Sequence, residues 1–207
     1  PQERNKVLYQ WKDDPHLLSR NEFIGNLYNE FQEEKSTRML VNTIVANYIL
    51  EGIYFYSGFM FFYNLGRNRL MPGSVQEIRY INRDENTHLW LFRNILLEEP
   101  ELFREEDVNR YRRMIKEGCE QEIKWGHYAI GDNVQGLSKD MITDYIQYLG
   151  NLRCSNLGFA PIYEEHISEP DSMKWVSQYS NANQIKTDFF EARSTAYAKS
   201  SALVDDL

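Results

Sequence analysis

The chain has 207 residues, of which 42% are hydrophobic, 14% aromatic and 26% charged. This length is enough for one domain or a large part of one, and so many aromatic side chains argue against a disordered chain, because they can form a core. A net charge of −8 argues against a nucleic-acid partner, since phosphates require a basic surface.

The two cysteines, Cys119 and Cys154, are isolated in the sequence and lack the spacing of a zinc site. Isolated cysteines suit the reducing environment of the cytosol. No charged segment followed by an apolar one opens the sequence, so nothing predicts export. We therefore expect a cytoplasmic protein.

Helical periodicity predominates from the first part of the chain. Residues 18–34 place apolar side chains roughly on one face, which predicts an amphipathic helix. The segment from Thr37 to Leu65 is much more apolar and follows Ser36, a candidate helix cap. We expect one long buried helix over this segment.

The middle of the chain has clear start and stop signals for further helices. A capping-box pattern beginning at Ser74 predicts a helix that runs to Glu98 and is closed by Pro100. Two more helices are expected over 105–130 and 138–158. Alternating strand patterns are scarce, so the sequence predicts an all-α bundle of four or five long helices.

The character of the sequence changes after the last of these helices. Pro161 and Pro170 interrupt any long helix, and Trp175 is a candidate anchor that ties this part to the body. The last residues are small and polar and end in a few apolar side chains, as in a solvated tail. We divide the chain into a partial bundle, 1–158, and an extension with a tail, 159–207.

Glu51 is the most informative single residue. It lies in the stretch 47–56, whose side chains are apolar on every side of a helix, as in a buried helix. A buried carboxylate must be paired, neutralised or bound to metal. An arginine from a neighbouring helix is as good an explanation as a metal for this residue alone.

A second pattern favours the metal. Glu85 and His88 are three residues apart and therefore share a helix face. A carboxylate-bridged two-metal site in a helical bundle takes a Glu from each of two helices and a Glu-x-x-His pair from each of two others. Together with Glu51, the pair predicts half of such a site.

The other candidate ligands do not complete the set. Glu122 and His127 are five residues apart and do not share a face, so a surface role or one beside the ligands is expected. His16 and His166 lie in expected loops and are interpreted as surface histidines. The chain thus contains three of about six expected ligands.

Two strings of sequence resemble a known family. Residues 50–59, and residues 81–89 with their Arg-Asp-Glu-x-x-His core, closely resemble the ligand helices of the small subunit of class I ribonucleotide reductases. Further similar positions are Gly136–Asp140, Asn151–Arg153, and Pro170 followed by Trp175. The resemblance covers nearly the whole chain and implies a ferritin-like bundle. The helices with the remaining ligands would precede Pro1, in the same polypeptide or in a second one.

The resemblance implies an oxidoreductase subunit. In that family a dinuclear centre, Fe/Fe, Mn/Fe or Mn/Mn, generates and stores the radical that the large subunit uses to reduce ribonucleotides. Glu51 and Glu85 would be carboxylate ligands and His88 a terminal ligand. Asp84 would accept a hydrogen bond beside the metals and help to move electrons and protons.

Further roles follow from the same resemblance. Phe55, Phe59 and Ile81 would form an apolar wall that protects the radical, although ordinary core packing explains them equally well. Tyr197 would relay the radical from the tail to the large subunit. A homodimer is also implied. The residues expected to dock the large subunit are Leu203, Val204 and Leu207.

Three other interpretations of the sequence are open. The run from Arg38 to Arg67 is long enough to cross a membrane, but its polar residues make a membrane protein a poor explanation. Another ferritin-like dimetal oxidase could have the same ligands. A non-catalytic half-subunit that only binds the large subunit would explain the missing ligands.

Overall fold

A computed structural model describes residues 2–98 and 105–180. Every regular element in these ranges is helical, so the all-α prediction is confirmed. The elements are α1 (Gln2–Tyr9), a 3-10 turn (Gln10–Lys12), α2 (Pro15–Glu33), α3 (Thr37–Ile49), a π segment (Leu50–Tyr54), α4 (Tyr56–Arg67), α5 (Pro72–Glu98), α6 (Glu105–Ala129), α7 (Lys139–Asn156), a 3-10 turn (Asp171–Met173) and α8 (Lys174–Ser180).

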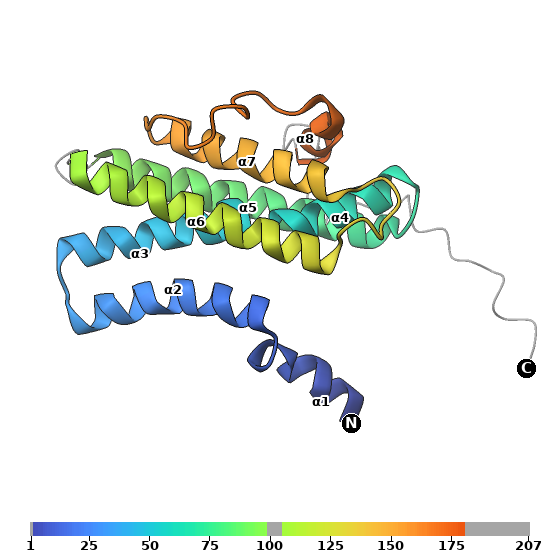
Figure 1. The fold of residues 1–207 in the computed structure, drawn as a ribbon, viewed down its shortest axis with the longest axis horizontal. Coiled ribbons are helices and arrows are strands. Elements are labelled where there is room, and N and C mark those ends of the chain that lie inside the picture. Colours follow the sequence, from blue (N-terminus) through green and yellow to red (C-terminus); the bar gives the residue numbers. More distant parts are fainter. Residues whose placement is uncertain (1, 99–104, 181–207) are drawn as a thin grey trace, which may run out of the picture.

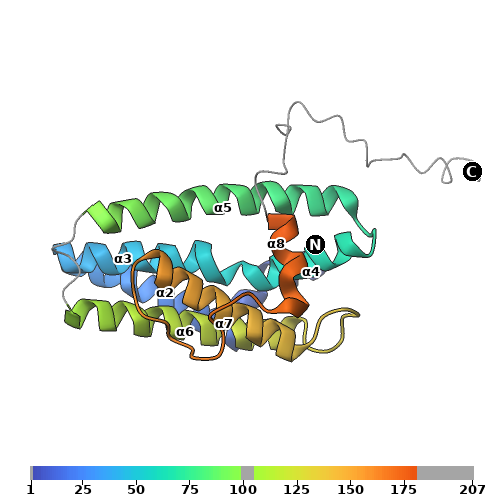
Figure 2. The ribbon, with the colours of Figure 1, turned by 90° about the horizontal axis from the view of Figure 1, so that it is seen from above.

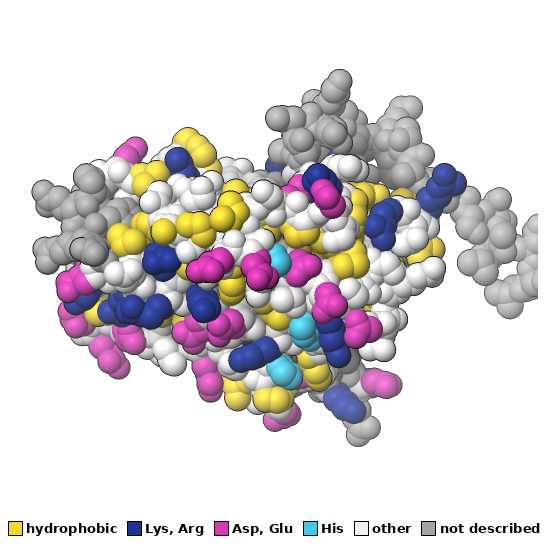
Figure 3. Space-filling view, turned by 45° about the horizontal axis from the view of Figure 1, so that its top comes forward, with side chains coloured by type: hydrophobic (Ala, Val, Ile, Leu, Met, Phe, Trp, Pro, Cys, Tyr) yellow, Lys and Arg dark blue, Asp and Glu magenta, His cyan; other side chains and the backbone are white. Residues whose placement is uncertain are grey.

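The long helices form a ferritin-like bundle. Its central line is the axis along which α3, the π segment and α4 run end to end, and α5 and α6 lie on opposite sides of it (Figures 1 and 2). Helix α2 packs on α3 and α6, and α7 packs on α6. On the face shown in Figure 3, basic and acidic side chains are interspersed.

The cap predicted at Ser36 is confirmed, the helix expected near Ser138 begins there with a cap as well, and the capping box expected at Ser74 is not found. The Ser36 hydroxyl accepts a hydrogen bond from the Met39 amide, and Ser138 caps α7 in the same way. Helix α5 begins at Pro72 instead, so the capping box at Ser74 is wrong. Proline favours the first helical position because its φ is already helical and it has no amide hydrogen to satisfy.

The prediction of one continuous helix from Thr37 to Leu65 is also wrong. The α-helical pattern ends at Ile49, the π segment follows, and the α-helix resumes only at Tyr56. A π turn accommodates one more residue than an α turn, and such insertions are frequent at functional sites. None of the helices in the described part of the chain is long and apolar enough to cross a membrane.

The core is centred on the line of α3 and α4. Val45, Ile49, Ile53 and Met60 are fully buried there. Helix α6 approaches this line closely at Gly118, where an added Cβ would lie 2.5 Å from Cγ2 of Ile49. The helices that position Glu51 are therefore held in a dense interior.

The segment after α7 folds back onto the bundle. Helix α8 contacts α4 and α5, with Val176 buried. The indole ring of Trp175 is only partly buried, and the Arg67 guanidinium lies 4.3 Å from its centroid. Trp175 thus contributes one contact of the attachment, beside the buried Val176 and Met173.

Candidate metal centre

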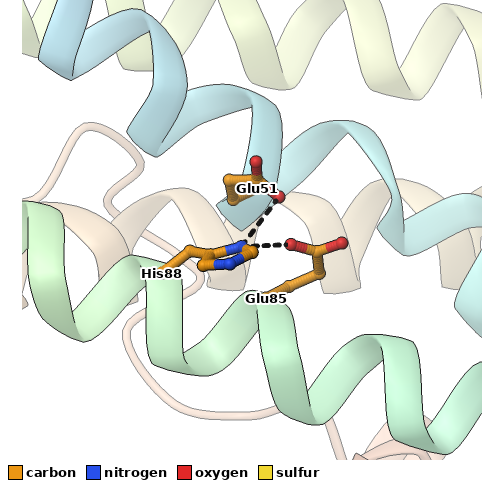
Figure 4. A group of neighbouring side chains, drawn as sticks. All are labelled: Glu51, Glu85 and His88. Atoms are coloured by element: carbon orange, nitrogen blue, oxygen red, sulfur yellow. Dashed lines mark hydrogen bonds and ion pairs between the residues drawn. The ribbon is translucent and has the colours of Figure 1, made fainter.

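Glu51 lies in the π segment, and the other two predicted ligands lie on the neighbouring helix α5 (Figure 4). The residues that follow Glu51, Gly52 and Ile53, are buried, whereas the carboxylate of Glu51 points toward α5. Its side chain is 17% exposed and that of Glu85 is 15% exposed. Both carboxylates are therefore largely withdrawn from water.

The three side chains converge on one point. Nδ1 of His88 lies 2.9 Å from Oε2 of Glu85 and 3.9 Å from Oε2 of Glu51. One potential ligand atom from each residue lies within 4.8 Å of the other two. Within the described ranges, no other group of three His, Cys, Asp or Glu side chains converges in this way.

The electrostatics of the cluster show an excess of negative charge. Burial, then the hydrogen bond and the charge repulsion of Glu85, raise the pKa of Glu51 to about 7. The hydrogen bond with Glu85 raises the pKa of His88, and the charge of Glu51 adds to that effect. Two carboxylates and an imidazole are a donor set that fits a divalent cation, which would replace the protons that Glu51 and His88 retain.

The cluster is open on one side. The His88 side chain is 50% exposed although it belongs to the predicted site. Ile81 and Ile95 lie one heptad before and after His88, so the three side chains share a face of α5, and both isoleucines are exposed. Exposed large apolar side chains beside candidate ligands indicate a surface suited to binding another segment.

The residues expected around the ligands have mixed positions. Asp84 is 65% exposed, and its nearest ionic partner is Arg83 at 3.5 Å. Phe59 is buried and its ring lies 6.1 Å from that of Phe55. Phe55 and Ile81 are exposed. Of the three residues expected to form an apolar wall, Phe59 therefore belongs to the core and the other two do not.

Of the two roles expected for Glu122, at the surface or beside the ligands, the surface role is wrong. Its side chain is 0% exposed, and Oε2 lies 2.7 Å from Nη2 of Arg20. Its other oxygen accepts a hydrogen bond of 2.9 Å from the Ser57 amide. Burial raises the pKa of Glu122 to about 7, although Arg20 holds it down. Pairing with an arginine from a neighbouring helix was the alternative to a metal for Glu51. The structure shows such a pair at Glu122.

A signal for this buried position was present in the sequence. Gly118 and Gly126 lie four residues before and after Glu122, so the three positions share one face of α6. An added Cβ at Gly126 would lie 2.7 Å from Oγ of Ser57. Small residues on both sides of an acid thus mark the face that approaches the line of α3 and α4.

The remaining candidates lie away from the cluster. His16 stacks on the Tyr128 ring, with centroids 4.5 Å apart, and Nε2 of His127 lies 2.9 Å from the Thr143 hydroxyl. His166 lies 4.0 Å from Asp144. The tail residues Tyr197, Leu203, Val204 and Leu207 lie outside the described residues.

Comparison with known proteins gives consistent matches. The family model described as ribonucleotide reductase, small chain, matches residues 1–170. The ribonucleoside-diphosphate reductase subunit beta of Treponema pallidum is 72% identical over 211 residues, which cover 100% of this chain and 60% of that protein. The subunit beta of Halalkalibacterium halodurans is 40% identical over 203 residues, with 96% and 58% of the two chains covered.

A solved structure supports the same relationship. The ribonucleotide reductase R2 subunit from Clostridium botulinum superimposes with a TM-score of 0.80 at 43% identity. The match covers 87% of this chain and 57% of that one. The chain therefore spans somewhat under two thirds of the length of these relatives.

Proposed function

The chain belongs to the ribonucleotide reductase small-chain family, and from this premise we propose that it is part of the small subunit of a ribonucleoside-diphosphate reductase. The observation that carries the proposal is the convergence of Glu51, Glu85 and His88. These residues come from the two strings that resemble the family's ligand helices. The relatives named above favour this function over another ferritin-like oxidase.

Glu51, Glu85 and His88 would hold a dinuclear centre from one side. Glu51 must lose the proton that its raised pKa retains, and His88 must be neutral to offer a ring nitrogen. The bound metals, Fe/Fe, Mn/Fe or Mn/Mn, would supply the oxidising power to form a radical. Asp84, next to Glu85 in the chain, would accept a hydrogen bond and help to move protons.

The proposal divides the chain into two functional parts. Residues 1–158 would form the partial bundle with half of the metal site, and 159–207 the extension that binds the large subunit. Tyr197 would relay the radical. Leu203, Val204 and Leu207 would be the docking residues. A cytoplasmic homodimer belongs to the proposal, and the two free cysteines suit a reducing compartment.

The remaining ligands would come from polypeptide outside the described residues. The exposed face of α5 around Ile81, His88 and Ile95 is a suitable place for the helices that bear them. We use "completed assembly" for this chain together with those helices and the large subunit.

Nucleotide reduction by the completed assembly tests the proposal. The unaltered assembly should reduce ribonucleoside diphosphates, and Glu85→Ala should abolish the reaction. Glu77→Ala is the matched control, because Glu77 is an exposed glutamate on the same helix. Binding of the large subunit without any reduction would contradict a catalytic role and favour the non-catalytic half-subunit.

A further inference from the structure

Side chains from two other helices form hydrogen bonds with the backbone where the π segment ends and α4 begins. The Tyr54 carbonyl accepts a hydrogen bond of 2.6 Å from Nη2 of Arg20 in α2. The Ser57 amide donates one of 2.9 Å to Oε1 of Glu122 in α6. A π segment interrupts the regular α-helical ladder, so backbone groups at the junction need partners from elsewhere. Arg20 and Glu122 provide them.

The two side chains also form an ion pair. Nη2 of Arg20 lies 2.7 Å from Oε2 of Glu122, with 11% and 0% of the side chains exposed. The guanidinium lies over the rings of Tyr54 and Trp125, 4.5 and 5.3 Å from their centroids. A buried ion pair generally stabilises a fold no more than apolar side chains of the same size. Stability alone therefore does not account for this pair.

We propose that Arg20 and Glu122 are positioning residues for Glu51. By bonding to the backbone on the carboxyl-terminal side of the π segment, they fix the turn that directs the Glu51 carboxylate toward Glu85 and His88. The inference rests on the proposed function, because it treats Glu51 as a metal ligand. Groups that hydrogen-bond to metal ligands commonly change metal affinity by about 10–100-fold when they are replaced, and Arg20 and Glu122 would act on Glu51 through the backbone.

The test is Mn²⁺ affinity in the completed assembly with the double substitution Arg20→Met and Glu122→Leu. Removing both charges together avoids an unpaired buried charge, yet leaves the Tyr54 carbonyl and Ser57 amide without these partners. Affinity should fall about tenfold or more. The matched control is Arg38→Met with Asp107→Leu, which removes a 3.0 Å ion pair between α3 and α6 away from the π segment. Its affinity should not change.

Amide hydrogen exchange provides a readout that needs no metal. In the metal-free protein, exchange over 50–57 should accelerate in the Arg20 and Glu122 double variant and not in the control. Combining Arg20→Met with Glu122→Gln instead of Glu122→Leu keeps an oxygen for the Ser57 amide and should restore part of the Mn²⁺ affinity lost in the first double variant. If the double variant does not fold, Arg20→Lys replaces it, since lysine cannot bond the carbonyl and the carboxylate with the same planar geometry.

The outcomes separate the two proposals. A folded double variant with the affinity of the unaltered protein would overturn the positioning role. So would unchanged exchange over 50–57. If the unaltered assembly binds no Mn²⁺, the proposed function fails, and the exchange measurement alone decides whether Arg20 and Glu122 hold the π segment.

Discussion

Arg153 of α7 donates a hydrogen bond from Nε to the carbonyl of Gly52, 3.1 Å away, and thereby contacts the residue next to Glu51. A Cβ added to Gly52 would lie 2.9 Å from the same nitrogen and 2.9 Å from Cδ2 of Leu89. The guanidinium also donates to the Tyr56 hydroxyl at 2.9 Å. Glycine at position 52 is therefore required by the close approach of α7 and α5 to the π segment.

Gly52→Ala should lower the free energy of unfolding by about 1–3 kcal/mol, because the buried Arg153 and Leu89 must move. Gly58→Ala is the control, since Gly58 is exposed and an added Cβ there meets nothing within 4 Å. That change should stabilise the protein by about 0.5–1 kcal/mol, as alanine does in helices. Denaturant unfolding measures both, and equal effects of the two substitutions would refute the steric explanation.

Asn151→Ala should lower the free energy of unfolding by about 2–4 kcal/mol, because several buried hydrogen bonds are lost together. The Asn151 amide nitrogen donates to the carbonyls of Tyr163 and His166, and its oxygen accepts from the amides of Ile162 and Tyr163. Asn109→Ala, which removes from an exposed side chain only a 3.5 Å contact with Arg112, should have little effect. Thermal unfolding of the two variants would show the difference. A similar small change in melting temperature for both variants would mean that other contacts hold the segment 162–166 on α7.

Stability of the metal-free protein should depend on pH through Glu51. Its pKa in the folded state, about 7, is above the ordinary value of 4.5, so the folded state binds this proton more tightly than the unfolded state does. The resulting stabilisation is complete below pH 4.5 and is lost as the pH rises through 7. Metal affinity should increase over the same range, because the metal competes with the proton.

Glu51→Gln should therefore make unfolding less dependent on pH between 4.5 and 7, as measured by denaturant unfolding at several pH values. Part of the dependence should persist, since burial also raises the pKa of Glu122 to about 7. Glu77→Gln is the control and should retain the full dependence. A Glu51→Gln profile that coincides with that of the unaltered protein would exclude the raised pKa of Glu51.

Tyr197→Phe should leave the metal content of the completed assembly unchanged and stop nucleotide reduction, because phenylalanine cannot lose a proton and an electron as a phenol does. Tyr9→Phe, a change at an exposed tyrosine of α1, is the control and should leave turnover intact. Metal analysis and a turnover assay on the same samples test this prediction. Retained reduction by Tyr197→Phe would remove the relay role.

Much of the fold could be predicted because local signals agree with the tertiary structure. The caps Ser36 and Ser138 and the end of α5 at Glu98 are encoded in a few neighbouring residues. The π segment could not be predicted, because its surroundings are apolar on every side and an inserted residue leaves no change in the pattern. The start of α5 at Pro72 is ambiguous in the sequence, because Pro72 and Ser74 are competing start signals.

The candidate site shows the same division. Glu85 and His88 could be placed together because three-residue spacing on a helix fixes their relative positions. The proximity of Glu51 was inferred only by combining two weak patterns. The burial of Glu122 against Arg20 could not be predicted, because the two residues belong to helices distant in the sequence, and periodicity carries no information about which helices meet.

The central claim is that Glu51, Glu85 and His88 form one side of a dimetal site. The most direct test is the iron and manganese content of the completed assembly, with Glu85→Ala and Glu77→Ala analysed in parallel. The account predicts about two metals per chain, their loss in Glu85→Ala and their retention in Glu77→Ala, with little metal bound by this chain alone. Unchanged metal content in Glu85→Ala, or no metal in the unaltered assembly, would contradict it.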